Sequence, residues 1–320
     1  MSQLRLFFVF VLLTLGALGQ ELPPERLPRQ GALAYEAFSP TKGALLTTHF
    51  ESLEAFKEAV DIEYQHIHHG FWSNPMVRIT HKTSGRKVES ILKEGINEYD
   101  FTDAKKGGFG QKAWLGLSSP YAVFNRRRIQ RAYFLAKRID KTFGADDVAF
   151  YDLAEAMVCH LRAEEVHRMP ANDLSEKGYL NTFNHQTGQC FTTAIFSEKL
   201  ADFMADAHEL SRIPELVTGA FSEKQILDIN EGAVDNYIDL INNEWGQEIG
   251  KTLRAKYGIE ASTHWTPELV TAFLNDLQRY YSWALNVGFE PFRTSDPLMI
   301  RFAKKINMVM GDLSILRPND

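Results

Sequence analysis

Residues 234–257 read VDNYIDLINNEWGQEIGKTLRAKY and carry the clearest helical signal in the chain. Apolar side chains recur here at the three- and four-residue spacing of an amphipathic helix. They are Val234, Ile238, Ile241, Trp245 and Ile249. Gly258 follows directly, and glycine is common just beyond the last turn of a helix. The pattern predicts one long helix with a buried face.

Further helices are predicted on both sides of this stretch. Pro120, Pro267 and Pro297 stand where proline is favoured, in the first turn of a helix. The predicted helices occupy residues 119–144, 146–167, 179–195, 197–212, a short segment that begins at 222, 234–257, 267–288 and 297–311. The sequence therefore predicts a mainly α protein with a helical domain over residues 119–320.

The region before this domain has a different character. Residues 20–45 are rich in proline and glycine, which predicts an extended leader. Residues 46–118 are predicted to form a mixed, partly irregular region. Within it, residues 53–64 look helical and residues 76–80 alternate like a strand. No ladder of further strands follows, so any sheet is predicted to be small.

Residues 1–19 have the features of a secretory signal peptide. Arg5 supplies a positive charge, residues 6–18 are almost wholly apolar, and small residues precede Gln20. A membrane anchor is the alternative, but the apolar run is short for a span. We therefore expect a secreted or periplasmic protein without a transmembrane segment after cleavage. Its expected partner is an extracytoplasmic substrate or an envelope component.

The charge of the chain argues against polyanionic partners. The formal net charge is −6, which gives no general attraction to nucleic acid or to anionic membranes. No nucleic-acid partner is therefore expected. The basic run Arg126, Arg127 and Arg128 is a local exception, and a solvated helix face accounts for it best.

The chain has two cysteines, Cys159 and Cys190. An exported protein meets an oxidising compartment, in which an even number of cysteines can pair. Both cysteines also fall within apolar helical patterns, where a thiol acts as a small hydrophobic group. The sequence leaves open one disulfide or two buried thiols.

Two predicted helices carry a polar stripe beside the apolar face. Each stripe follows the spacing i, i+4, i+7, i+11, which keeps it on one line of a helix. The stripes are Asn181, His185, Gly188 and Thr192, and Asp235, Asp239, Asn242 and Gly246. Polar groups at the edge of a core are costly unless something pairs with them. The stripes therefore predict partners, and their glycines predict close approach of a helix or a ligand.

The sequence Asp206-Ala-His-Glu209 lies between the two stripes. An ideal helix places His208 at the edge of the apolar face and Glu209 nearly opposite that face. It also separates Asp206 and His208 by about 200°, so these two cannot ligate one ion together. His208 is therefore predicted to be the residue with a role in the interior.

Three histidines near residue 66 form a second candidate site. In a strand, His66 and His68 would share one face, as two metal ligands could. His69 is the third histidine, and no carboxylate follows closely. A surface or packing role is the favoured interpretation.

Residues 175–257 resemble an uncharacterised family of bacterial domains, known only as a domain of unknown function. That family carries Asn-x-Phe-Arg-His, then Asp-Ala-His-Glu, then Asp-Leu-x-Asn-Asn-x-x-Gly-Arg-x-Ile-Gly. The present chain has Asn181-Thr-Phe183-Asn-His185, Asp206-Ala-His-Glu209 and Asp239-Leu-Ile-Asn-Asn243-Glu-Trp-Gly246-Gln-Glu-Ile-Gly250. The resemblance implies a helical domain with a shared polar site, but no settled activity. Asn184 and Gln247 replace two arginines of the family, which argues against an anion-binding role at those positions.

These residues suggest hydrolysis as the leading hypothesis. His185 or His208 would act as general base or metal ligand, Asp239 would orient the histidine or ligate the metal, and Asn242 would hold the substrate or the developing charge. The candidate substrate-binding residues are Asn181, Asp235, Asn243 and Thr192. The cofactor is unknown; a divalent metal is one candidate, with His185, His208 and Asp239 as its candidate ligands.

Two alternatives stay open beside an exported hydrolase of an extracytoplasmic polymer or lipid. Polar residues at helix edges often hold neighbouring helices together, which predicts a non-enzymatic envelope or secreted module. A helical glycosidase that relies on one carboxylic acid, with dispensable histidines, is a weaker alternative. The chain has no His-Glu-x-x-His pair and no Gly-x-Ser-x-Gly elbow that would decide the question.

Overall fold

The fold is taken from a computed structural model of the chain. The structure describes residues 53–69, 72–81, 87–91, 107–108, 110, 113, 120–176, 178–212, 233–285 and 287–311. The predicted signal peptide at residues 1–19, the leader at 20–45 and the short helix that begins at Ser222 lie outside the described residues.

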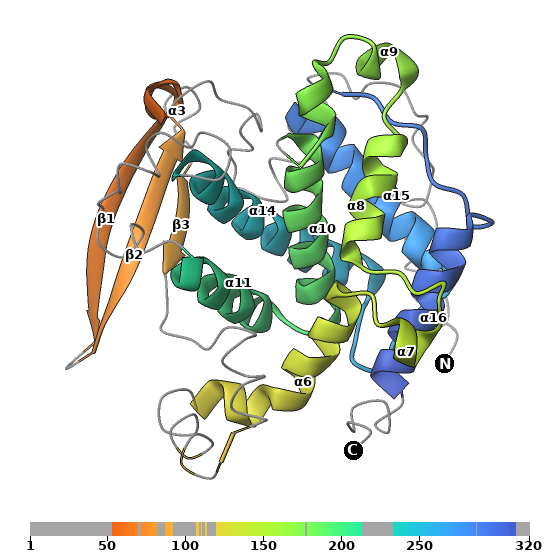
Figure 1. The fold of residues 1–320 in the computed structure, drawn as a ribbon, viewed down its shortest axis with the longest axis horizontal. Helices are drawn as coiled ribbons and strands as arrows, with labels where there is room; N and C mark the ends of the chain where they lie inside the picture. The colour runs from red at the N-terminus through yellow and green to blue at the C-terminus, as the bar shows by residue number, and fades with distance from the viewer. Residues whose placement is uncertain are drawn as a thin grey trace, which may run out of the picture.

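Most of the described chain is helical, so the prediction of a mainly α protein is confirmed (Figure 1). The longer helices are α6 (Pro120–Ala136), α8 (Phe150–Cys159), α10 (Tyr179–Ile195), α11 (Glu198–Arg212), α14 (Ala233–Tyr257), α15 (Pro267–Leu285) and α16 (Pro297–Gly311). The shorter ones are α3 (Leu53–Ala59), α7 (Asp140–Phe143), α9 (Ala163–Val166) and the 3-10 turn η2 (Ala171–Leu174). None of the described helices combines the length and the apolar character needed to cross a membrane.

Helix boundaries predicted from proline, glycine and periodicity agree with α10, α11, α14 and α16 to within a residue or two. Two predicted helices are each divided, however. The segment 119–144 forms α6 and α7, and the segment 146–167 forms α8 and α9. The second division has a tertiary cause, because Arg162 N donates to Gly288 O and Glu290 N donates to His160 O. The backbone between α8 and α9 pairs with a distant strand-like segment rather than continuing a helix.

A small antiparallel sheet precedes the helices. Its strands are β1 (Val60–His69), β2 (Trp72–His81) and β3 (Lys87–Ile91), in the order β1-β2-β3. Val77 and Ile79 of β2 are buried, as the predicted alternation requires. The helix predicted over residues 53–64 is wrong beyond Ala59, because Val60 to Tyr64 pair with β2 in register from His81 to Val77. Pairing with a neighbouring strand outweighs the local helical pattern there.

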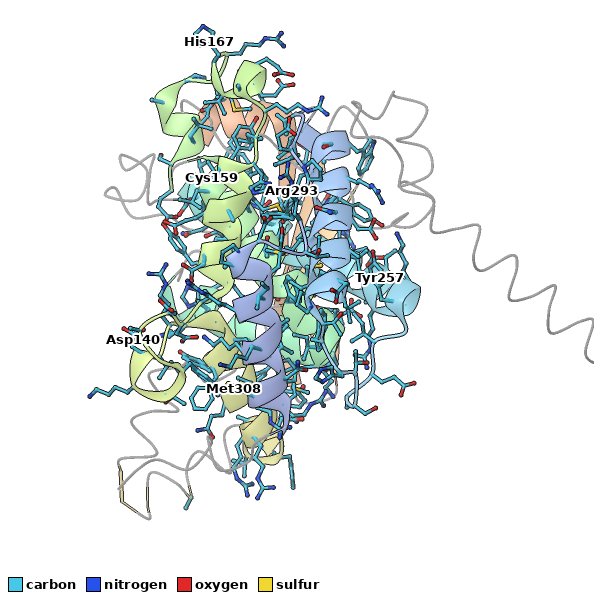
Figure 2. The ribbon with its side chains drawn as sticks, turned by 90° about the vertical axis from the view of Figure 1, so that its right-hand side faces the viewer. Asp140, Cys159, His167, Tyr257, Arg293 and Met308 are labelled. Carbon is cyan, nitrogen blue, oxygen red and sulfur yellow. The ribbon has the colours of Figure 1, made fainter. Side chains whose placement is uncertain are left out.

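Helix α14 crosses the middle of the molecule and α10 packs directly on it (Figure 1). The sheet lies on one side of this pair, and α16 lies on the other side, in front in the turned view (Figure 2). The core next to α10 is aromatic, since Phe191 lies 4.5 Å from the Phe273 ring centroid and 5.2 Å from that of Phe302. Every residue of α14 from Tyr237 to Gly250 is buried, including its polar ones. This helix therefore brings polar side chains into the interior.

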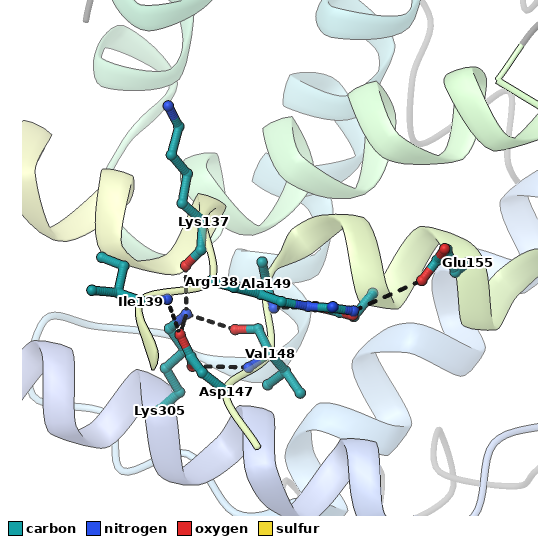
Figure 3. Close-up of polar contacts among 9 residues, drawn as sticks. Lys137, Arg138, Ile139, Asp147, Val148, Ala149, Glu155 and Lys305 are labelled. Atoms are coloured by element: carbon teal, nitrogen blue, oxygen red, sulfur yellow. Dashed lines mark hydrogen bonds and ion pairs between the residues drawn. The ribbon is translucent and has the colours of Figure 1, made fainter. Parts of the chain in front are cut away.

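A buried lysine ties α16 to the segment between α6 and α8 (Figure 3). The Nζ atom of Lys305 donates to Asp147 Oδ2 at 2.9 Å, to Lys137 O at 2.8 Å and to Val148 O at 2.6 Å. An ammonium group has three protons to donate, and all three have acceptors here. The contact holds two segments together that are far apart in the sequence.

The two cysteines are not paired. Cys190 is fully buried in α10, whereas Cys159 is exposed at the end of α8. Of the two alternatives that the sequence left open, the structure has two thiols, of which only Cys190 is buried. Burial raises the pKa of the Cys190 thiol well above its usual value, so this cysteine acts as a hydrophobic core residue.

Candidate functional site

The site begins with the close packing of α14 against α10. A Cβ atom on Gly246 would lie 2.6 Å from Gln186 O, and one on Gly250 would lie 2.6 Å from Cys190 O. No side chain fits at such distances, so the two glycines let the helix backbones approach. The prediction for Gly246 is confirmed. The prediction for Gly188 is wrong, because its nearest neighbour is the Phe150 side chain at an ordinary 3.4 Å.

Polar side chains of α10 and α14 meet along the same contact. Asn181 Nδ2 donates to Asp235 Oδ1 at 2.9 Å and to Asp239 Oδ1 at 3.1 Å. One amide thus holds two carboxylates that lie one helical turn apart. Asn181 of the first polar stripe thus pairs with Asp235 and Asp239 of the second.

His185 uses both of its ring nitrogens. Asn243 Nδ2 donates to Glu209 Oε1 at 3.3 Å, so the other end of that amide, Oδ1, accepts from His185 Nδ1 at 3.0 Å. Nε2 then lies 3.3 Å from Asp239 Oδ1. With a proton on Nδ1, a neutral imidazole would turn the lone pair of Nε2 toward a carboxylate oxygen. A proton or a metal ion between Nε2 of His185 and Oδ1 of Asp239 would bind both atoms.

Glu209 faces the same cluster from α11. It is only 3 % exposed and lies in line with the buried Ala201 and Ala205, at intervals of four residues. The prediction that Glu209 points away from the core is therefore wrong. The helical-wheel argument assumed one apolar face, but α11 contacts α6, α10 and α14 and is buried on more than one side. Two small alanines allow that second contact.

The surroundings of Glu209 favour its protonated form. Burial is the largest cause that raises its pKa, and the negative charge of Asp239 is the next, with a smaller contribution from Asp235. His185 and the hydrogen bond from Asn243 oppose the shift but do not cancel it. The resulting pKa of Glu209 is about 8. Burial and the neighbouring carboxylate of Asp239 therefore outweigh the two groups that favour ionisation of Glu209.

Three side chains from three helices could hold a metal ion. His185, Glu209 and Asp239 each offer a ligand atom, and these atoms lie within 4.8 Å of one another. Two ligands about 2.1 Å from one ion lie at most about 4.2 Å apart, so the widest gap would have to close by at least about half an ångström on binding. The side chains of His185 and Asp239 are 20 % and 12 % exposed, which makes His185 the most accessible member.

Other residues predicted for the site have separate contacts. Asn242 is 1 % exposed, accepts from Gln186 Nε2 at 2.9 Å and donates to Thr182 Oγ1 at 3.3 Å. Its amide lies inside the contact between the helices. Thr192 donates to Gly188 O within its own helix at 2.7 Å. Two turns, or about 10 Å, separate it from His185 along α10, so the structure does not bring it to the cluster.

His208 is half-buried in α11 and is not one of the three side chains whose ligand atoms meet. The structure instead brings in its neighbour Glu209, which sequence reasoning had set aside. The signal was present, because Glu209 is the last residue of the Asp-Ala-His-Glu motif. In the second candidate site, His66 and His68 do lie in strand β1, but their side chains are outside the described part of the chain.

Comparisons with protein-family models, with curated proteins and with solved structures found no match for this chain. The resemblance to an uncharacterised bacterial domain family therefore stays a prediction that rests on its three motifs. The candidate site is defined by its own geometry.

Proposed function

We propose that this chain is an exported hydrolase in which His185, Glu209 and Asp239 hold a divalent metal ion. The observation that carries the proposal is the meeting of these three ligand atoms, from α10, α11 and α14, within 4.8 Å. An imidazole and two carboxylates are a ligand set that zinc and related divalent ions accept. Burial is the largest cause that raises the pKa of Glu209, and a cation would offset the next one, the negative charge of Asp239.

The second layer of contacts supports the same assignment. Metal-ligating histidines usually donate their other ring N–H to an oxygen that orients the ring. Asn243 Oδ1 would take that part for His185 Nδ1, and Asn181 Nδ2 donates to Asp239 Oδ1. Both amides thus hold a ligand in place without binding the ion themselves.

Hydrolysis is the chemistry that such a site serves. With three protein ligands, a bound ion keeps room for water, whose pKa it lowers so that hydroxide forms near neutral pH. Asp235 is half-buried beside Asn181, where its carboxylate can take up a proton or bind substrate. The substrate class that we propose is an extracytoplasmic polymer or lipid, because residues 1–19 have the pattern of a signal peptide.

The direct test is metal binding by the purified protein. Titration of chelator-treated protein with Zn²⁺ or Mn²⁺ in a calorimeter should give one site per chain. Asn243→Ala removes a residue that orients a ligand, and should weaken metal binding roughly 10–100-fold. Asp239→Asn removes a ligand, and should weaken metal binding by more than that. Hydrolysis of envelope polymers and lipids, assayed with and without chelator, should follow metal occupancy.

His160→Ala is the matched control for His185→Ala. His160 lies on α8, where its ring stacks on Phe292 and its Nδ1 atom bonds to Glu290 O. The control should keep its metal affinity, whereas His185→Ala should lose it with a nearly unchanged melting temperature. Equal metal binding by both variants would exclude the proposed ligands.

A second candidate function is a non-enzymatic envelope module. The observation in its favour is that polar pairing continues along α10 and α14 without any ionisable group, as in Gln186–Asn242–Thr182 and in Gln189–Gln247. These contacts are interhelical clasps. Absence of metal binding, together with a large fall in melting temperature for His185→Ala, would favour this candidate.

A further inference from the structure

Helix α6 carries the strongest local concentration of positive charge in the described chain. Its sequence, PYAVFNRRRIQRAYFLA, contains four arginines and no acidic residue, in a protein whose net charge is −6. Three of the arginines, Arg126, Arg127 and Arg128, are exposed. The buried side of α6 is apolar and is formed by Ala122, Ile129, Ala132 and Leu135.

A large hydrophobic side chain lies on the same outer face. Phe124 is 86 % exposed, compared with 47 % for Ile300 and 37 % for Tyr64, the other exposed large hydrophobic residues in the described chain. Phe124 and Arg127 are three residues apart, and Arg131 follows four residues later. That spacing places the three on one side of the helix. Among the described residues, Phe124 belongs neither to the hydrophobic core nor to the side chains packed against it.

The arginines differ in how far the fold uses them. Arg128 donates to Phe196 O at 2.7 Å and so caps the C-terminal end of α10. Arg131 is half-buried, and its Nε atom has no hydrogen-bond partner. Arg127 lies one turn away from Arg131, and like charges at that spacing repel each other. Among the described residues, no carboxylate forms an ion pair with Arg127 or Arg131.

We propose that Phe124, Arg127 and Arg131 form a docking face for an anionic lipid bilayer. Arginines on an amphipathic helix bind lipid phosphates, while an aromatic side chain enters the boundary between headgroups and acyl chains. Such a partner would supply an anion to the exposed Arg127 and bury Phe124 at the same time. A nucleic-acid strand fits less well, because it needs a groove and successive aromatic platforms rather than one phenylalanine on a convex helix.

Sedimentation with vesicles tests this proposal. Two preparations are compared, one of phosphatidylcholine alone and one of equal parts phosphatidylcholine and phosphatidylglycerol. The purified protein should bind only the second, and salt should weaken the binding. Phe124→Ser and Arg127→Gln should each reduce the vesicle partition coefficient about fivefold. Ile300→Ser, which removes an exposed hydrophobic residue from α16, should have no effect.

The variants are expected to fold, because both side chains lie on the surface, and melting temperatures would verify this. Equal binding of Phe124→Ser and the unchanged protein would overturn the proposal, as would binding to dextran sulfate but not to vesicles. This interaction does not depend on the metal site, so chelator treatment should leave vesicle binding unchanged.

Discussion

Lys305 and Glu209 are each only 3 % exposed, but their surroundings differ in kind. Lys305 meets one carboxylate, that of Asp147, and two carbonyl oxygens, which together accept all three of its protons. Glu209 meets one amide donor, that of Asn243, and lies near the carboxylate of Asp239. Charge is balanced around the first group and unbalanced around the second.

This difference separates a structural contact from a candidate site. Buried ions are tolerated when a partner and hydrogen bonds compensate for lost water. Burial lowers the pKa of Lys305, and the bonded carboxylate of Asp147 acts against that shift. Burial and the nearby carboxylate of Asp239 raise the pKa of Glu209, although His185 and Asn243 oppose the shift. Ionisable groups perturbed in this way concentrate at functional sites, which is why the cluster around His185 is the better candidate.

Removal of the lysine should have the largest effect on stability. Lys305→Met leaves the carboxylate of Asp147 buried without its cation, which should lower the free energy of unfolding by about 3–5 kcal/mol. Lys304→Met is the matched control, because Lys304 is exposed on the same helix. Urea denaturation would give the free energy of unfolding of both variants. A decrease of less than about 1 kcal/mol for Lys305→Met would contradict the view that Lys305 stabilises the buried carboxylate of Asp147.

Replacement of Glu209 should raise the stability of the fold at high pH, whereas replacement of Lys305 should lower it. The pKa of Glu209 in the folded protein is about 8, above its ordinary value of 4.5, so the folded state retains a proton that the unfolded state releases. Stability of metal-free protein should therefore fall as the pH rises from about 4.5 to about 8, by at most about 1.4 kcal/mol per pH unit.

Glu209→Gln keeps the shape of the protonated group and removes its titration. The variant should lose this pH dependence and be more stable than the unchanged protein above pH 8. Thermal melts of chelator-treated protein across this range provide the measurement. If the melting temperatures of the two proteins changed with pH in the same way, Glu209 would have its ordinary pKa. The contrast with Lys305 would then disappear.

The smallest effects concern the glycines that set the distance between α10 and α14. Gly246→Ala would place a Cβ atom against Gln186 O, so it should destabilise the fold by about 1–3 kcal/mol and weaken metal binding. Gly188→Ala meets only the Phe150 side chain at ordinary contact distance, and should stabilise α10 by about 0.5–1 kcal/mol. Denaturation curves that moved in the same direction for both would contradict the assigned helix contact.

Sequence reasoning located most of the fold and part of the site. The spacing of Asn181 and His185 on one helix, and of Asp235 and Asp239 on another, predicted that each needed a polar partner. The structure shows that they are largely each other's partners. The assignment failed for Glu209, since a wheel drawn for one helix contains no information about how many neighbours cover it.

Local rules account for what the sequence determined alone. Helix ends at proline and glycine, the buried face of α14 and the strand alternation in β2 depend on residues that are close along the chain. Three results depended on contacts between distant segments: the extension of β1 into a predicted helix, the division of α8 from α9, and the inward position of Glu209. Tertiary packing decided these, because the free energy of pairing and burial across the fold exceeds that of local helical preference.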